Sequence, residues 1–243
     1  MNIIKLNAID STNSYLINLG RKTKLEDVTI VVANEQTKGR GQQGASWQSV
    51  PQQSLLFSMF KRFDNLSSDK ISSIAFAVSI GVENGLKRLQ IPNLAIKWPN
   101  DIMSRSKKMA GILIENQLKQ GKVTSTVIGI GINVNEEKFN SLPQAISMLQ
   151  ATGTKYNLKE VLDIVVEEIL IQLGEIEKED TLELKTKYES SLFRKEMISV
   201  FENPEGNRFN GMIKGVNDVG QLVIENEDDL LTAYQLKEIK LLF

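Results

Sequence analysis

Two neighbouring charged segments constrain the fold of this chain most strongly. Lys97-Trp98-Pro99-Asn100-Asp101 is followed by Lys108-Met109-Ala110-Gly111-Ile112-Leu113-Ile114-Glu115, which begins seven residues after Asp101. The pattern predicts two adjacent short strands whose ends carry two lysines, an amide and a carboxylate. Because neighbouring lysines repel each other unless an anion lies between them, we expect a site for a polyanion with its magnesium ion, such as ATP. A charged hairpin tip without a ligand is the alternative.

The sequence contains no cysteine and no histidine among its 243 residues. The missing thiols exclude a disulfide framework, a thiolate nucleophile and a thiolate metal site. The missing imidazoles exclude a histidine base and a histidine zinc ligand. Any catalysis therefore uses lysine, arginine, carboxylates, hydroxyl groups, backbone amides or a hard cation.

Charge and hydropathy argue against a general DNA or membrane surface. The 29 basic and 30 acidic residues give a formal net charge of -1. No apolar run approaches the ~20 residues that span a bilayer, and the first residues lack the basic segment and apolar core of a signal peptide. We therefore expect a cytoplasmic protein with no DNA or membrane partner.

Hydrophobic periodicity predicts a mixture of strands and helices over residues 1–192. The run 122–134 is the richest in β-branched residues and is expected to be a central strand. Strands are expected at 2–9, 28–34, 54–60, 94–98, 101–103, 109–116 and 122–134, and helices after residues 10–12 and at 69–90, 158–173 and 180–192.

The pattern changes after about residue 193. Short strands are expected at 197–202, 208–216, 220–225, 230–235 and 237–243. Turn residues separate them, as in Asn203-Pro204-Glu205-Gly206 and Asn217-Asp218-Val219-Gly220. Residues 193–243 are therefore expected to form a second, small β-barrel domain.

A glycine-rich segment follows the strand expected at 28–34. It reads Gln36-Thr37-Lys38-Gly39-Arg40-Gly41-Gln42-Gln43-Gly44-Ala45-Ser46-Trp47. Its glycines allow the backbone to approach a ligand closely, and Arg40 can present a bidentate fork to phosphate or carboxylate. The segment is not a P-loop, because no Gly-Lys-Ser/Thr follows. An ordinary surface loop is the alternative.

Two further segments carry polar groups next to expected strands. Asp10-Ser11-Thr12-Asn13 can hydrogen-bond a neutral polar ligand, or simply cap a helix. Gly129-Ile130-Gly131-Ile132-Asn133-Val134-Asn135 allows close backbone approach to a ligand and offers Asn133 as an oxygen donor for a phosphate-bound metal. An ordinary strand that ends in an Asn turn is the alternative.

Together, in this order and spacing, the five blocks resemble the biotin protein ligases over essentially the whole chain. The family pattern is a Ser/Thr-Thr-Asn start, Gln-x-x-Gly-Arg-Gly-Arg-x-Gly-Arg-x-Trp, Lys-Trp-Pro-Asn-Asp, Lys-x-x-Gly-Ile-Leu-x-Glu and Gly-Ile-Gly-Ile-Asn-Val. The resemblance implies an α+β fold like that of class II aminoacyl-tRNA synthetases, a mixed sheet backed by helices, followed by an SH3-like barrel. Because no helix-turn-helix precedes the first expected strand, the monofunctional group without a DNA-binding domain is expected.

The resemblance also implies roles for individual residues. The expected catalytic groups are Lys108, Arg40 and Asp101. The expected biotin contacts are Ser11, Thr12, Asn13, Gln36, Gly39, Arg40, Gly41, Gln42, Lys108, Gly111 and Gly131. The expected ATP contacts are Arg40, Trp47, Lys97, Asn100, Asp101 and Asn133, with Trp98 nearby and with Asp101 and Asn133 as magnesium ligands. The sequence departs from the family at Gln42 and Ala45, where arginines are common, which leaves less fixed charge to retain an adenylate.

The implied activity is that of a biotin–[acetyl-CoA-carboxylase] ligase. Such an enzyme uses ATP and Mg²⁺ to form biotinyl-5'-adenylate and transfers the biotin to a lysine of a biotin carboxyl carrier protein or domain. Related enzymes are monomers or sheet-to-sheet dimers, so a homodimer is compatible with the sequence.

Three alternatives remain at this point. A lipoate-type ligase of the same fold would lack the Lys97–Asp101 block, and a related octanoyltransferase would need a cysteine. A non-catalytic biotin-binding regulator would need neither Lys108 nor Asp101. An adaptor protein would leave the glycine-rich segment and these lysines unexplained.

Overall fold

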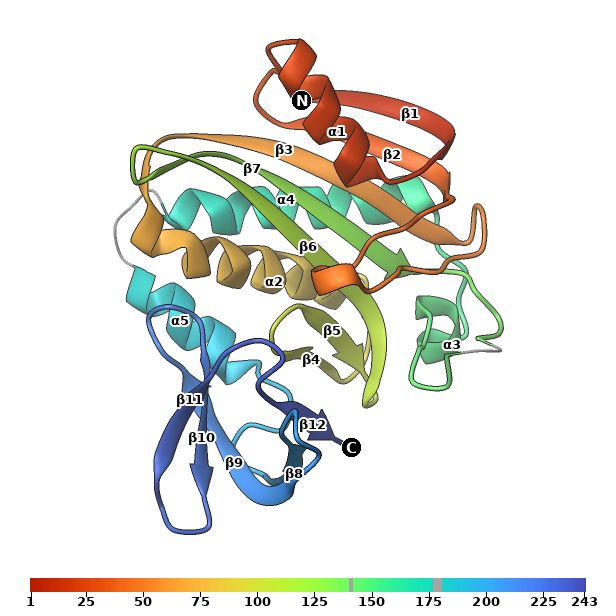
Figure 1. Ribbon diagram of the computed structural model, residues 1–243. Helices are drawn as coiled ribbons and strands as arrows, with labels where there is room; N and C mark the ends of the chain where they lie inside the picture. The colour runs from red at the N-terminus through yellow and green to blue at the C-terminus, as the bar shows by residue number, and fades with distance from the viewer. Residues whose placement is uncertain (140–141, 177–180) are drawn as a thin grey trace.

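The computed structural model describes residues 1–139, 142–176 and 181–243. These residues form a mixed seven-stranded sheet backed by helices and a separate five-stranded antiparallel sheet (Figure 1). The predicted fold class, an α+β domain followed by a small SH3-like β domain, is confirmed. No helix in the described part of the chain is both long and apolar enough to cross a membrane.

The large sheet has β7 at its centre. β7 pairs with β3 on one side and with β6 on the other, as its β-branched sequence predicts. Only β1 and β2 are parallel, and the other neighbours in the sheet are antiparallel. The strand order is β1 (Asn2–Ile9), β2 (Thr29–Gln36), β3 (Ser54–Ser67), β7 (Lys122–Asn133), β6 (Lys107–Lys119), β5 (Asp101–Ser104) and β4 (Leu94–Lys97).

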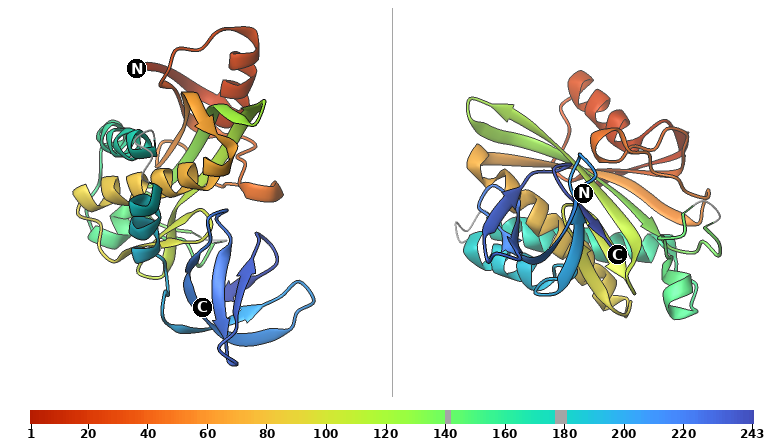
Figure 2. Two further views of the ribbon diagram at one scale, coloured as in Figure 1. Left: turned by 90° about the vertical axis from the view of Figure 1, so that its left-hand side faces the viewer. Right: turned by 60° about the horizontal axis from the view of Figure 1, so that its bottom comes forward.

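Helices cover the two faces of this sheet unequally (Figure 2). α2 (Ile71–Arg88) and α4 (Leu158–Ile176) lie on one face, where strand residues such as Phe57, Met59 and Ile128 form the main core. α5 (Thr181–Ser190) follows α4 and packs against α2. Among the α-helices of the described residues, α1 (Thr12–Lys22) lies on the opposite face, where Leu16 packs onto Val31, Phe60 and Val127. The rest of that face is therefore available for a ligand.

Two short helical segments, α3 (Met148–Thr152) and η1 (Gln42–Gly44), lie outside the predicted helices, and a third, η2 (Ser68–Lys70), overlaps the start of the helix expected at 69–90. α3 begins at a capping box, in which the Ser147 side chain accepts from the N–H of Gln150, and it ends at the left-handed Gly153. The 3₁₀ turns η1 and η2 lie in the glycine-rich segment and before α2.

The small sheet has the order β11-β10-β9-β8-β12. Its strands are β8 (Ile198–Glu202), β9 (Arg208–Val216), β10 (Leu222–Asn226), β11 (Leu231–Tyr234) and β12 (Lys240–Leu242). It is attached to α5 by the ion pair of Lys185 with Asp218 at 2.7 Å and by a hydrogen bond from the N–H of Val216 to Glu189 at 3.0 Å. The domain boundary between residues 192 and 193 remains our proposal.

α2 and α4 lie in close contact at Gly81 of α2. A Cβ atom at this position would lie 2.6 Å from the Cα of Ile169 and 2.8 Å from its backbone nitrogen. Both atoms belong to the main chain of α4, so an added methyl group would have to push the two helices apart. Gly81 therefore sets the distance between the two helices that back the sheet.

We predict that Gly81→Ala lowers the free energy of unfolding by about 1–3 kcal/mol, the usual penalty for overpacking a core. Urea unfolding followed by circular dichroism measures the change. Gly174→Ala on α4 is the matched control, because no described atom lies within 4 Å of the Cβ it would add. Equal stability of the two variants would contradict the close contact.

Candidate active site

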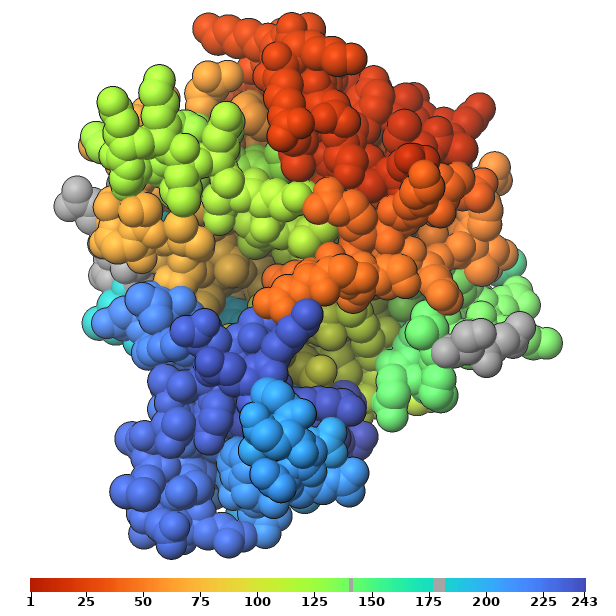
Figure 3. Space-filling model, in the orientation of Figure 1, coloured from red at the N-terminus to blue at the C-terminus, as the bar shows by residue number. Residues whose placement is uncertain are grey.

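A cavity of about 680 Å³ opens on the face of the sheet that carries α1. Its walls come from the N-terminal end of α1, the glycine-rich segment, the strands β4 to β7 and the C-terminal domain. Figure 3 shows the glycine-rich segment (orange) meeting the edge of the C-terminal domain (dark blue) in front of the olive β4–β6 region. The cavity thus lies where the two domains and the segment meet.

The floor of the cavity is built from glycines on one face of β6 and β7. Gly111 pairs with Gly131, and Gly129 lies two residues further along β7 on the same face. A Cβ at Gly131 would lie 2.5 Å from the indole of Trp47, and one at Gly129 would lie 2.2 Å from Oδ1 of Asn13. Only glycine leaves room for these side chains, so the strands supply a flat surface without side chains.

One end of the cavity carries uncharged polar groups. Thr12 donates from its N–H and its hydroxyl to Oε1 of Gln36, at 2.8 and 3.0 Å. The hydroxyl of Ser58 lies 2.7 Å from Oγ1 of Thr12 and 2.5 Å from Oδ1 of Asn13. Ser11 caps α1, so helix capping and a ligand-binding role are compatible here.

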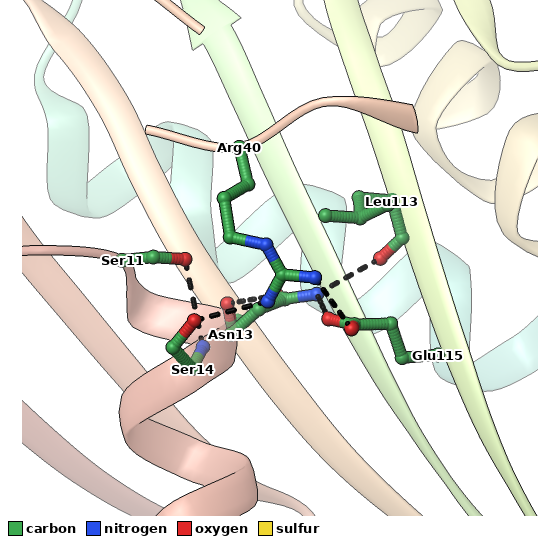
Figure 4. A network of polar contacts seen from close by, with 7 residues as sticks. Ser11, Asn13, Ser14, Arg40, Leu113 and Glu115 are labelled. Carbon is green, nitrogen blue, oxygen red and sulfur yellow. Dashed lines mark hydrogen bonds and ion pairs between the residues drawn. The ribbon is translucent and has the colours of Figure 1, made fainter. Parts of the chain in front are cut away.

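Arg40 connects the glycine-rich segment to this polar end (Figure 4). Its guanidinium pairs with Oε1 of Glu115 at 2.8 Å and donates to Oγ of Ser14 at 3.0 Å. The other oxygen of Glu115 accepts from Nδ2 of Asn13 at 2.9 Å. Arg40 lines the cavity but its charge is directed to Glu115 in this structure.

The other end of the cavity is charged. Nζ of Lys108 lies 2.6 Å from Oδ1 of Asp101 and 5.5 Å from the centre of the Trp47 ring. Burial holds the pKa of Lys97 below its usual value; Asp101 opposes this shift, and the positive charges of Lys108 and Lys240 add to it. A bound anion would relieve the repulsion among the three lysines, which supports a polyanion site.

Asn100 joins β4 and β5 to β6 beside these charges. Its Nδ2 donates to the carbonyl of Ile112 at 2.7 Å, and its own carbonyl accepts from the N–H of Ile112 at 3.0 Å. Trp98, two residues earlier, donates from its indole N–H to the carbonyl of Gly220 at 2.9 Å. The segment Lys97–Asp101 therefore also attaches the C-terminal domain to the large sheet.

The structure brings most of the predicted site residues to this one cavity. Those that line it are Ser11, Thr12, Asn13, Gln36, Arg40, Gly41, Gln42, Trp47, Lys97, Trp98, Asn100, Asp101, Lys108, Gly111 and Gly131. Their individual roles remain predictions.

Two predicted residues do not line the cavity. Gly39 accepts from the N–H of Trp47 at 2.9 Å and closes the hairpin of the glycine-rich segment. The amide of Asn133 donates to the carbonyls of Lys108 and Ile146, both at 3.4 Å. Asp101 lines the cavity, whereas Asn133 does not. The expected role of Asn133 as a metal ligand stays a prediction.

Sequence reasoning gave no role to several residues at this site. Ser58 was detectable only as a polar residue within the apolar run 54–60. Glu115 ends the second charged block, but its partners Asn13 and Arg40 are distant in the sequence. The C-terminal domain adds Glu202, Lys237 and Lys240 to the lining, and Nζ of Lys237 lies 3.5 Å from the carbonyl of Gln43. No local pattern could have indicated these contacts.

Residues 6–133 match the model of the biotin/lipoate A/B protein ligase family. The chain belongs to this family. One relative is the bifunctional ligase/repressor BirA of Bacillus spizizenii, which is 28% identical to this chain over 240 residues. The match covers 96% of this chain and 72% of the relative. The biotin–[acetyl-CoA-carboxylase] ligase of Mycobacterium tuberculosis is 30% identical over 142 residues, 57% of this chain and 52% of the relative.

Solved structures of ligases agree with this assignment. The biotin protein ligase from Aquifex aeolicus in complex with biotin and ATP superposes with a TM-score of 0.80 at 27% identity. The match covers 99% of this chain and 98% of the other. The family fold therefore extends over both sheets of the ligase-family chain.

Proposed function

We propose that this protein is an ATP-dependent ligase that activates biotin as biotinyl-5'-adenylate and transfers it to a lysine of a biotin carboxyl carrier protein or domain. The observation that carries the proposal is that one cavity is lined by the uncharged polar groups around Asn13, by Arg40, and by the ion pair of Lys108 with Asp101. The solved relative that binds biotin and ATP supports it.

The uncharged end of the cavity suits a cyclic urea. Such a ring has two N–H donors and one carbonyl acceptor. Asn13 and Thr12 line this end of the cavity, and the buried hydroxyl of Ser58 contacts both of them without lining it. The glycine floor has no side chains of its own, and the indole of Trp47 lies against Gly111 and Gly131 in this structure. The apolar part of the ligand would lie on this floor beside Trp47 or in its place. A dithiolane ring has no N–H groups and would leave the second lone pair of the buried Asn13 Oδ1 without a donor, which favours biotin over lipoate as the substrate.

The first half-reaction joins two anions. A carboxylate oxygen of biotin attacks the α-phosphorus of ATP, the bond from that phosphorus to the bridging oxygen breaks, and pyrophosphate leaves. Lys108 lies at the charged end of the cavity beside Asp101, and its ammonium group can neutralise charge on both reactants once they are bound. Arg40 adds a second cation when it turns from Glu115 towards the phosphates, and its segment then excludes water from the adenylate.

The cavity fits a magnesium ion that arrives with ATP. No group of three or more acidic side chains that could hold a metal occurs among the described residues, so the donor set suits an ion held mainly by phosphate oxygens. Asp101 would supply a carboxylate oxygen to this ion, and the ion would neutralise phosphate charge. We do not assign Asn133 to it from geometry, because its amide donates to backbone carbonyls.

In the second half-reaction, the amine of an acceptor lysine attacks the acyl carbon of the adenylate. The new C–N bond forms, the C–O bond to AMP breaks, and the nitrogen loses a proton. The amine must be neutral, although its unperturbed pKa is about 10.4. Asp101 would orient this amine and accept its proton, since the sequence contains no histidine.

We predict that the protein exchanges labelled pyrophosphate into ATP only when biotin and Mg²⁺ are present, without any acceptor protein. Adenylate formation requires biotin, ATP and Mg²⁺ but no acceptor protein, so this assay isolates the first half-reaction. Exchange driven by lipoate instead of biotin would identify a lipoate-type ligase. Biotin binding without any exchange would identify a non-catalytic regulator, and both results would contradict the proposal.

We predict that Lys108→Ala lowers the rate of biotin-dependent pyrophosphate exchange about 100-fold or more, because it removes a fixed charge that stabilises the transition state. The melting temperature should change little, because Lys108 lies at a strand end and is partly exposed. Lys107→Ala removes the neighbouring, exposed lysine and is the matched control. Exchange by Lys108→Ala at the rate of the control would remove Lys108 from the mechanism.

A further inference from the structure

We propose that Glu115 is a positioning residue, which fixes the orientation of the Asn13 amide and couples it to Arg40 on the glycine-rich segment. Glu115 lies behind the cavity wall and is not part of its lining, so it acts through these two neighbours. The contacts are properties of the ligand-free protein, whereas their effect on ligand binding rests on the proposed function.

The amide of Asn13 can point in two directions, and Glu115 selects one of them. Nδ2 donates to Oε2 of Glu115 at 2.9 Å and to the carbonyl of Leu113 at 3.3 Å, so both of its hydrogens have acceptors. Oδ1 then faces the hydroxyl of Ser58 and the glycine floor. A flipped amide would place its oxygen against a carboxylate and a carbonyl, which repel it.

The selected orientation determines which ligand the polar end accepts. Oδ1 of Asn13 has two lone pairs, and the hydroxyl of Ser58 occupies one of them. The other is free to accept an N–H from a ligand ring. A buried acceptor at this position favours a ring that carries N–H donors and disfavours one that does not.

The second oxygen of Glu115 holds the glycine-rich segment. The pair of Arg40 with Glu115 at 2.8 Å is partly shielded, since the two side chains are 44% and 28% exposed. Ser14 of α1 supplies a second acceptor for the same guanidinium, at 3.0 Å. Arg40 therefore ties its segment to α1 and β6, the same two elements that position Asn13 (Figure 4).

Only a carboxylate can make both contacts, because the two neighbours are both donors. A glutamine at position 115 would place its NH₂ group against either the Asn13 amide or the Arg40 guanidinium, so one of the two hydrogen bonds would be lost. Glu115→Gln keeps the shape of the side chain and removes its charge. It therefore separates positioning from packing.

We expect Glu115→Gln to weaken biotin binding, measured by calorimetric titration without ATP, by a factor of about 10 or more, as for a lost hydrogen bond to a charged group. In an Asn13→Ala background, the same substitution should cause no further loss, because Glu115 acts through Asn13. Glu160→Gln, an exposed site on α4 on the opposite face of the sheet, is the matched control and should bind as the unmodified protein does. Binding by Glu115→Gln within twofold of the control, or an additive loss in the double variant, would overturn the proposal.

A ligand-free measurement tests the coupling to Arg40 separately. Amide hydrogen exchange should be faster in Glu115→Gln at Gly41 and Trp47, whose N–H groups close the hairpin of the glycine-rich segment. Unchanged exchange would refute the coupling. If the unmodified protein fails to bind biotin, the proposed function is wrong, and the exchange result still decides whether Glu115 holds the segment.

Discussion

The absence of side chains at Gly111, Gly129 and Gly131 is the constraint on which the rest of the site depends. These glycines lie on one face of the paired strands β6 and β7, at the centre of the sheet. Because α2 and α4 cover the other face, the sheet is supported from one side and open on the other. The indole of Trp47 and the amide of Asn13 come within contact distance of the strand backbone only for this reason. Polar and charged groups can therefore gather at opposite ends of one flat surface.

Most of the fold could be predicted from hydrophobic patterning, since helix α4 shows helical spacing of its buried residues and the central strands β3 and β7 are continuous, largely apolar runs. β7 and α4 begin where the sequence pattern places them, at Lys122 and Leu158. β3 is longer than predicted, because its polar end continues to pair with β7 past an irregularity between Arg62 and Leu66. α3 has five residues, too few for a periodic signal, and depends on its capping box. Short elements whose bounds depend on capping hydrogen bonds or on strand register cannot be recognised from the hydrophobic pattern of the sequence.

The sequence motifs predicted which residues form the candidate site, but they did not predict the side-chain contacts between those residues. The blocks around Arg40, Lys97 and Lys108 identified the residues that the structure gathers at one cavity. The ion pair of Arg40 with Glu115 and the contact of Trp98 with Gly220 join residues 75 and 122 positions apart, so no local pattern encodes them. Asn133 shows the opposite case, in which a motif position donates to backbone carbonyls instead of facing the cavity.

Calorimetric titration of Gly131→Val with biotin tests the central claim most directly. The account predicts that binding is lost, because a side chain at this position occupies the ligand surface, while Gly174→Ala, a glycine substitution on the far helix, binds as before. Circular dichroism of both variants should show the native spectrum. Unimpaired binding by a folded Gly131→Val protein would contradict the role of the glycine floor and place the ligand elsewhere.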